Sequence, residues 1–172
     1  MTPAELLVDA FERVRGVVEA TVDGLTPEQL AARPAGNGNS IAWLVWHLTR
    51  VQDTHLAAAF GTEQVWTAEG WFDRFRLPFA PGATGYGQTA ADVAAVHVSS
   101  GDLLCGYLNA VHARTVAHVS RLVDADLTRI VDESWDPPVT LGARLISVIA
   151  DDLQHAGQAA YVRGLVAGPP SH

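Results

Sequence analysis

The sequence predicts an all-α protein built as a four-helix bundle with long crossover loops. Apolar residues recur at three- and four-residue steps in four long segments, which is the spacing of one helix face. Helix-capping residues stand directly before several of these segments, and no alternating run long enough for a strand ladder occurs. With 172 residues, 48% of them hydrophobic, the chain fits a single domain, residues 1–172, that buries its core without disulfides.

Each long segment has a recognisable start or stop. Pro3 suits the first turn of the first helix, because its missing N–H has no helical partner there. Ser40 and Thr140 are good N-caps for the second and fourth helices, and Gly168-Pro169-Pro170 stops the fourth. The four predicted helices span residues 3–22, 41–60, 102–123 and 141–166.

The connections carry shorter features. Thr26 and Gln29 form a capping box for a short helical turn, and Thr89 caps another short helix over residues 90–97. Residues 130–139 are expected to be irregular or briefly extended. Residues 61–88 mix Gly and Pro with aromatic side chains, which predicts an ordered crossover loop. Its aromatic residues either cover a functional site or only pack against the bundle, and both interpretations stay open.

Composition excludes several classes of partner. The net charge of −8 and the lack of an Arg-rich run argue against nucleic acid or an anionic membrane surface as the main partner. All 11 Lys and Arg positions are arginine, which indicates high-GC codon usage. Cys105 is the single cysteine, so no internal disulfide is possible, and the N-terminus lacks a secretory pattern. We therefore expect a soluble, cytoplasmic protein.

A carboxylate and an imidazole four residues apart suggest a metal site. Asp151 and His155 lie one helical turn apart, with Cβ atoms about 6 Å from each other, so one ion can touch both. A third ligand must come from another helix, and His47, within the second predicted helix, is the best placed candidate. Considered singly, an Asp-x-x-x-His pair is more often a surface pair, and His47 is more often a hydrogen-bonded core residue.

Other reactive residues receive weaker assignments. Cys105 lies in an apolar stretch, which favours an inert core thiol over a nucleophile. Asp152 points about 100° away from Asp151 on the same helix, so we expect an outer carboxylate of the site or a surface carboxylate. The remaining histidines before the fourth helix complete no ligand set and are expected at the surface or between helices: His55, His97, His112 and His118.

A few side chains could bind a substrate. Gln158 and Arg144 lie on nearly the same helical face as the Asp151 and His155 pair. Arg144 could hold an anionic substrate group, although we favour its pairing with a surface acid. Trp66 and Trp71, in the aromatic crossover, would suit an apolar substrate. Arg50, Arg74 and Arg76 are secondary candidates of the same kind.

Two segments resemble the signatures of a known family. Residues 39–48, Asn-Ser-Ile-Ala-Trp-Leu-Val-Trp-His-Leu, and residues 151–158, Asp-Asp-Leu-Gln-His-Ala-Gly-Gln, are similar to those of the DinB-like superfamily of four-helix metalloproteins. The resemblance covers nearly the whole chain. It implies that His47 and His155 occupy two of the family's histidine positions, while Asp151 stands where many members carry a third histidine.

That carboxylate resembles the branch of mycothiol-dependent maleylpyruvate isomerases and mycothiol S-transferases. A carboxylate lowers the charge of the site by one unit relative to an imidazole, which makes the ion a weaker Lewis acid but a better-held one. The resemblance implies a metal-dependent thiol S-transferase that activates mycothiol to attack an electrophile, and mycothiol fits a high-GC actinobacterial source. Zn is the expected ion, and Ni, Fe or Mn also suit these ligands.

Two other functions remain open at this point. The same three ligands could activate water instead of a thiol, which would make the protein a metal-dependent hydrolase. The chain could also be a stress-response bundle that keeps a vestigial metal site without catalysis. A homodimer that pairs through helices is compatible with each of these functions.

Overall fold

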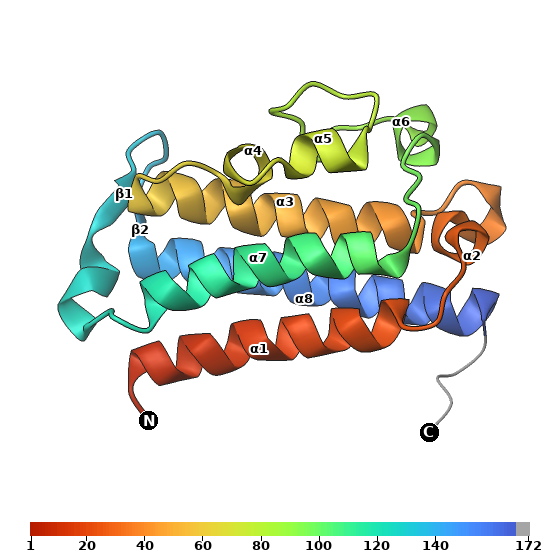
Figure 1. Ribbon diagram of the computed structural model, residues 1–172. Helices are drawn as coiled ribbons and strands as arrows, with labels where there is room; N and C mark the ends of the chain where they lie inside the picture. The colour runs from red at the N-terminus through yellow and green to blue at the C-terminus, as the bar shows by residue number, and fades with distance from the viewer. Residues whose placement is uncertain (168–172) are drawn as a thin grey trace.

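The computed structural model describes residues 1–167, and its frame is a bundle of four long helices (Figure 1). The four-helix prediction is confirmed, and three of the helices have the predicted bounds. The third helix ends four residues before its predicted end, and the predicted stop at Gly168-Pro169-Pro170 lies outside the described residues. The long helices are α1 Pro3–Val22, α3 Ile41–Phe60, α7 Gly101–Val119 and α8 Leu141–Val166.

The early end of α7 has a local cause. The side chain of Asp126 accepts a hydrogen bond from the backbone N–H of Val123 at 2.9 Å, which starts a new short 3-10 helix, η2, at Asp124–Thr128. Val123 is 61% exposed, so burial of its side chain would not stabilise a longer α7. Helix periodicity alone could not reveal this competing start.

The helix directions explain the long crossover. In Figure 1, α3 and α7 run the same way, so the chain must return along the length of the bundle between them. The predicted crossover is ordered, and it also contains short helices that the sequence pattern did not resolve: α4 Val65–Ala68 and α5 Trp71–Phe75. The predicted helix after Thr89 is present as α6 Ala90–Ala94, shorter than expected.

The other connections are small. Thr26 and Gln29 form the predicted capping box of α2 Pro27–Ala31, and a 3-10 turn, η1, follows at Pro34–Gly36. The segment predicted to be briefly extended forms a two-stranded antiparallel sheet of β1 Ile130–Asp132 and β2 Val139–Thr140.

The core consists of two clusters along the bundle. The larger one joins the C-terminal half of α1 to α3, α7 and the C-terminal half of α8, and the crossover adds aromatic side chains to it. The smaller one joins the N-terminal half of α1 to the C-terminal ends of α3 and α7 and the N-terminal half of α8. Both clusters bury large apolar side chains, which is the main source of stability in such a bundle. Within residues 1–167, no helix is both long and apolar enough to span a membrane.

Candidate metal centre

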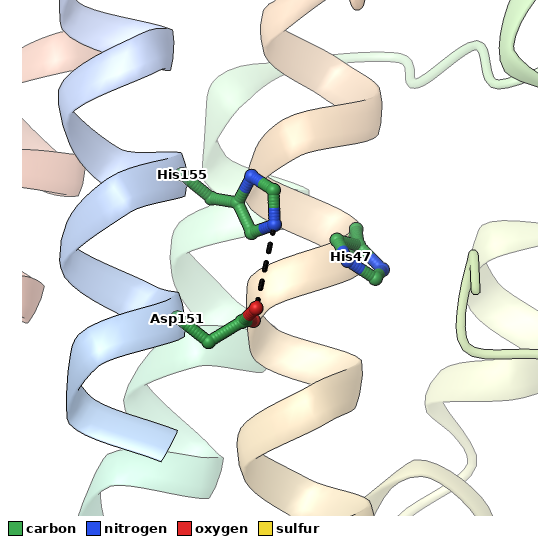
Figure 2. A group of neighbouring side chains, drawn as sticks. All are labelled: His47, Asp151 and His155. Carbon is green, nitrogen blue, oxygen red and sulfur yellow. Dashed lines mark ion pairs between the residues drawn. The ribbon is translucent and has the colours of Figure 1, made fainter. Parts of the chain in front are cut away.

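Two long helices bring together the three side chains predicted as metal ligands. His47 lies on α3, and Asp151 and His155 lie one turn apart on α8. Their ligand atoms all lie within 4.8 Å of one another, and His155 Nε2 is 3.6 Å from Asp151 Oδ1 (Figure 2). His47 is buried, whereas the side chain of Asp151 is 39% exposed, so the cluster opens to solvent on the α8 side.

The imidazole of His47 is held in place by a hydrogen bond to its Nδ1 and by stacking on Trp43. Its Nδ1 lies 2.5 Å from the carbonyl oxygen of Thr84, and a carbonyl only accepts, so Nδ1 carries the proton and donates. The ring also stacks on Trp43, with centroids 4.6 Å apart, and Trp43 Nε1 donates to Gln88 Oε1 at 2.7 Å. Nε2 is therefore the nitrogen of His47 that is left to bind an ion.

The imidazole of His155 is oriented in the same manner. Its Nδ1 donates to Oε1 of Gln158 at 2.9 Å, which leaves Nε2 facing Asp151. The ring meets that of His47 edge to face, with centroids 4.8 Å apart, and Trp43 stands edge-on to it at 6.3 Å. A hydrogen bond to the far nitrogen is the usual way in which a protein fixes a ligating histidine.

A buried arginine anchors the loop that supports His47. Arg50 is fully buried, and its Nε donates to the carbonyl of Ala83, the residue before Thr84, at 3.1 Å. Its Nη1 donates to the hydroxyl of Tyr107 at 3.1 Å and lies 3.5 Å from Oδ2 of Asp53, so its charge is compensated. Arg50 thus acts on the site only through the loop.

The donor set fits a divalent ion. Bonds of about 2.1 Å at tetrahedral angles separate two donor atoms by about 3.4 Å, close to the 3.6 Å between His155 and Asp151. Asp151 Oδ2 is buried and has no hydrogen-bond partner among the described residues. Burial lowers the pKa of His47, which favours the neutral form that binds metal. Two neutral imidazoles and one carboxylate leave a divalent ion with one net positive charge.

Gln158 contacts the cluster, whereas Arg144 bonds to other residues. Gln158 contacts His155, as described above. Arg144 donates to Oδ2 of Asp132 on β1 at 2.7 Å and to Nδ1 of His55 at 3.2 Å. The acid partner that we favoured for Arg144 is therefore present, and substrate binding by Arg144 stays a prediction.

Trp66 and Trp71 lie in the core. They are 2% and 8% exposed, and their rings pack against Tyr107 of α7 at centroid distances of 5.0 and 5.7 Å. Phe79 packs against Trp46 of α3 at 5.7 Å. These contacts show that the aromatic side chains of the crossover pack in the core. That Trp66 and Trp71 also bind substrate stays a prediction.

Two further expectations concern single residues. Asp152 is not at the surface: it is fully buried, and neither carboxyl oxygen has a hydrogen-bond partner in the described chain. The 100° turn from Asp151 carries it inward, where burial, and then the charge of Asp151, raise its pKa well above the usual value. Cys105 agrees with an inert thiol, because burial, and then its acidic neighbours, raise its pKa to about 11.

Sequence reasoning missed the residues that support the ligands. Trp43 precedes His47 by four residues, and this spacing on one helix face was a usable signal. Thr84 and Gln88 act from the crossover, and nothing in their local sequence marks them. Gly85 carries a weak signal: its φ of +98° favours glycine, and a Cβ there would stand 2.5 Å from His47 Nδ1.

Fold and site together define the class of protein: a DinB-like four-helix protein with a possible metal site between its second and fourth long helices. Residues 6–168 match the model of the family described as Mycothiol-S-transferase, and the chain belongs to this family. A search of curated protein sequences finds no match.

A solved structure supports the fold independently. The chain is similar to a conserved protein of Enterococcus faecalis, known from a crystal structure, with a TM-score of 0.90 and 31% sequence identity. The similarity covers 98% of this chain and 99% of that one, so it includes the crossover as well as the long helices.

Proposed function

We propose that the protein is a metal-dependent mycothiol S-transferase that works on an ion held by His47, Asp151 and His155. The observation that carries this proposal is the pair of fixed imidazoles. Thr84 and Gln158 each occupy the Nδ1 of one histidine, so both Nε2 atoms remain free beside a carboxylate. Membership of the mycothiol S-transferase family supports mycothiol as the thiol.

The chemistry divides between the ion and the chain. A divalent ion supplies the positive charge that favours a thiolate over a thiol near neutral pH. His47 and His155 hold that charge with neutral nitrogens, and Asp151 adds the one negative charge of the set. Three protein ligands leave room for the sulfur of the co-substrate. The sulfur of the co-substrate would attack an electrophilic carbon of the second substrate: an S–C bond forms, the bond between that carbon and its leaving group breaks, the leaving group departs as an anion, and the thiol proton goes to solvent.

The test measures metal content and thiol transfer on the same samples. Purified protein loaded with zinc is given 1-chloro-2,4-dinitrobenzene with mycothiol, with glutathione or with no thiol. We expect one ion per chain, with turnover fastest for mycothiol. Ni, Fe and Mn are loaded in parallel, because these ligands accept each of them. His47→Ala and Asp151→Asn should lose both metal and turnover while their circular dichroism stays native.

A matched control removes an imidazole elsewhere. His112 of α7 pairs with Glu12 of α1 at 2.9 Å, so His112→Gln should keep the metal and the activity. Wild-type protein that binds no ion would overturn the proposal. Electrophile consumption that does not depend on thiol would assign the site to water activation, which makes the protein a hydrolase instead.

The proposal also implies a location. Low-molecular-weight thiols act where thiols stay reduced, and the chain carries one free cysteine, so we place the protein in the cytoplasm.

A further inference from the structure

A pocket lies away from the proposed metal ligands. It has a volume of about 600 Å³ and forms where α5, the segment before α7 and the first turn of α7 meet. None of the three metal ligands lines it. Its apolar wall consists of Phe75, Val98 and Leu103. The volume is in the range of pockets that bind small organic molecules.

The polar groups of this pocket are mainly basic. Arg74, Arg76 and His97 line it together with one acid, Asp73, in a chain whose net charge is −8. Arg74 lies over the ring of Trp71, with its guanidinium carbon 4.4 Å from the ring centroid, so the cation is oriented by a buried aromatic side chain.

Two of these cations have no carboxylate or carbonyl partner among residues 1–167. Within residues 1–167, eight of the eleven arginines bond through their side chains to a carboxylate or a backbone carbonyl: Arg13, Arg15, Arg33, Arg50, Arg114, Arg129, Arg144 and Arg163. Arg74, Arg76 and Arg121 make no such bond in the described chain, and the first two share this pocket. Their guanidinium groups are free to bind an anion.

The backbone of Arg76 adds an independent observation. Arg76 ends α5 in the left-handed conformation, with φ +52° and ψ +34°. Glycine adopts this conformation without strain, whereas a residue with a Cβ costs about 1–2 kcal/mol there. A side chain kept at such a position is expected to serve a purpose that glycine cannot, and here it lines the basic pocket.

We propose that this pocket binds a small organic carboxylate with an apolar body. A guanidinium group pairs with a carboxylate through two parallel hydrogen bonds, and Arg74 and Arg76 together offer two such groups. Phe75, Val98 and Leu103 accommodate the apolar part of the ligand. The proposal does not rest on the metal site, because no metal ligand lines this pocket.

The test uses benzoate as probe on the metal-free protein, with binding followed by amide chemical shifts and by calorimetry. Benzamide has the same shape without the charge, and inorganic phosphate has the charge without the apolar body. We expect benzoate to bind with shifts at Val98 and Leu103, and both comparison probes to bind at least about tenfold more weakly.

Variants locate the cations that carry binding. Arg76→Gly relieves the left-handed strain, so it should fold at least as well as wild type while binding benzoate about tenfold more weakly. Arg74→Gln should weaken binding similarly. Arg121→Gln removes one unpaired charge outside this pocket and should leave binding unchanged.

Each of the following results would contradict one claim of the pocket proposal. No saturation by roughly 10 mM benzoate would exclude the site. If Arg121→Gln weakens benzoate binding as much as Arg74→Gln does, the effect comes from the net charge of the protein and not from this pocket. If phosphate binds as tightly as benzoate, the claim that the ligand needs an apolar body is wrong. If benzamide binds as tightly as benzoate, the claim that the ligand needs a carboxylate is wrong.

Discussion

The two halves of the crossover between α3 and α7 do different work. The first half, Val65 to Phe79, turns its aromatic rings into the core, where Trp66 packs on Tyr107 and lies 2% exposed. The second half, residues 83–88, contacts His47, one of the three proposed metal ligands, through the backbone carbonyl of Thr84 and the close approach of Gly85. Thr84 fixes the tautomer of His47, and Gly85 leaves no room for a Cβ beside that ring.

The two halves use different parts of their residues: side chains fill the core in the first, and the backbone contacts His47 in the second. The aromatic side chains Trp66 and Trp71 of the first half are buried against Tyr107, which gives them a packing role. The support of His47 comes instead from residues with small or polar side chains, because a carbonyl oxygen and a missing Cβ are backbone properties. Stability and site geometry are therefore separable by mutation along one connection.

The largest effect on stability is expected in the aromatic half. Trp66→Ala removes a buried ring from the core and should lower the free energy of unfolding by about 3–5 kcal/mol, measured by urea denaturation. Trp135 is 65% exposed, and Trp135→Ala should change it by no more than about 0.5 kcal/mol. The folded fraction of Trp66→Ala should still bind zinc with wild-type affinity, and a loss of affinity would break the division between the halves.

The second half should show the opposite result. Gly85→Ala places a Cβ 2.5 Å from His47 Nδ1 and should weaken zinc binding by about 10–100-fold. Gly87 has a similar positive φ of +71° and nothing within 4 Å of an added Cβ, so Gly87→Ala isolates the cost of the backbone conformation. Competition with a chelator measures both affinities. Equal affinities for the two variants would show that Gly85 does not position His47.

Gln158 allows the same question to be asked on α8. Gln158→Ala removes the acceptor of His155 Nδ1 and should weaken zinc binding by about tenfold. Among the described residues, the side chain of Gln154 bonds only to the carbonyl of Ala150 on its own helix, so Gln154→Ala should leave the affinity unchanged. Similar affinities for Gln158→Ala and wild type would mean that the ring of His155 is oriented by packing alone.

The smallest effect is expected at Cys105. Because the pKa of its thiol is raised to about 11, the thiolate is scarce near neutral pH and becomes abundant only as the pH approaches that value. The rate of alkylation by iodoacetamide should therefore keep rising to about pH 11, while that of free glutathione levels off earlier. Cys105→Ala should retain full thiol transfer, and a loss of turnover would make this thiol part of the reaction.

Local sequence determined much of this protein. The periodicity and capping residues predicted all four long helices and the bounds of three of them, because helix formation depends on neighbours three and four residues away. The same rule placed Asp151 and His155 one turn apart on α8. His47 needed more than spacing: its helical position was readable, but its inclusion as the third ligand came from the family resemblance of two distant segments.

Tertiary structure decided the rest. How close His47 lies to α8, which loop carbonyl faces its ring and whether Asp152 turns inward all depend on how helices pack and how a long crossover returns. The packing of Trp66 and Trp71 against Tyr107 is likewise a contact between distant parts of the chain that their local sequence did not predict. Contacts between residues far apart in the chain are set by the summed packing of the bundle, which no local pattern encodes.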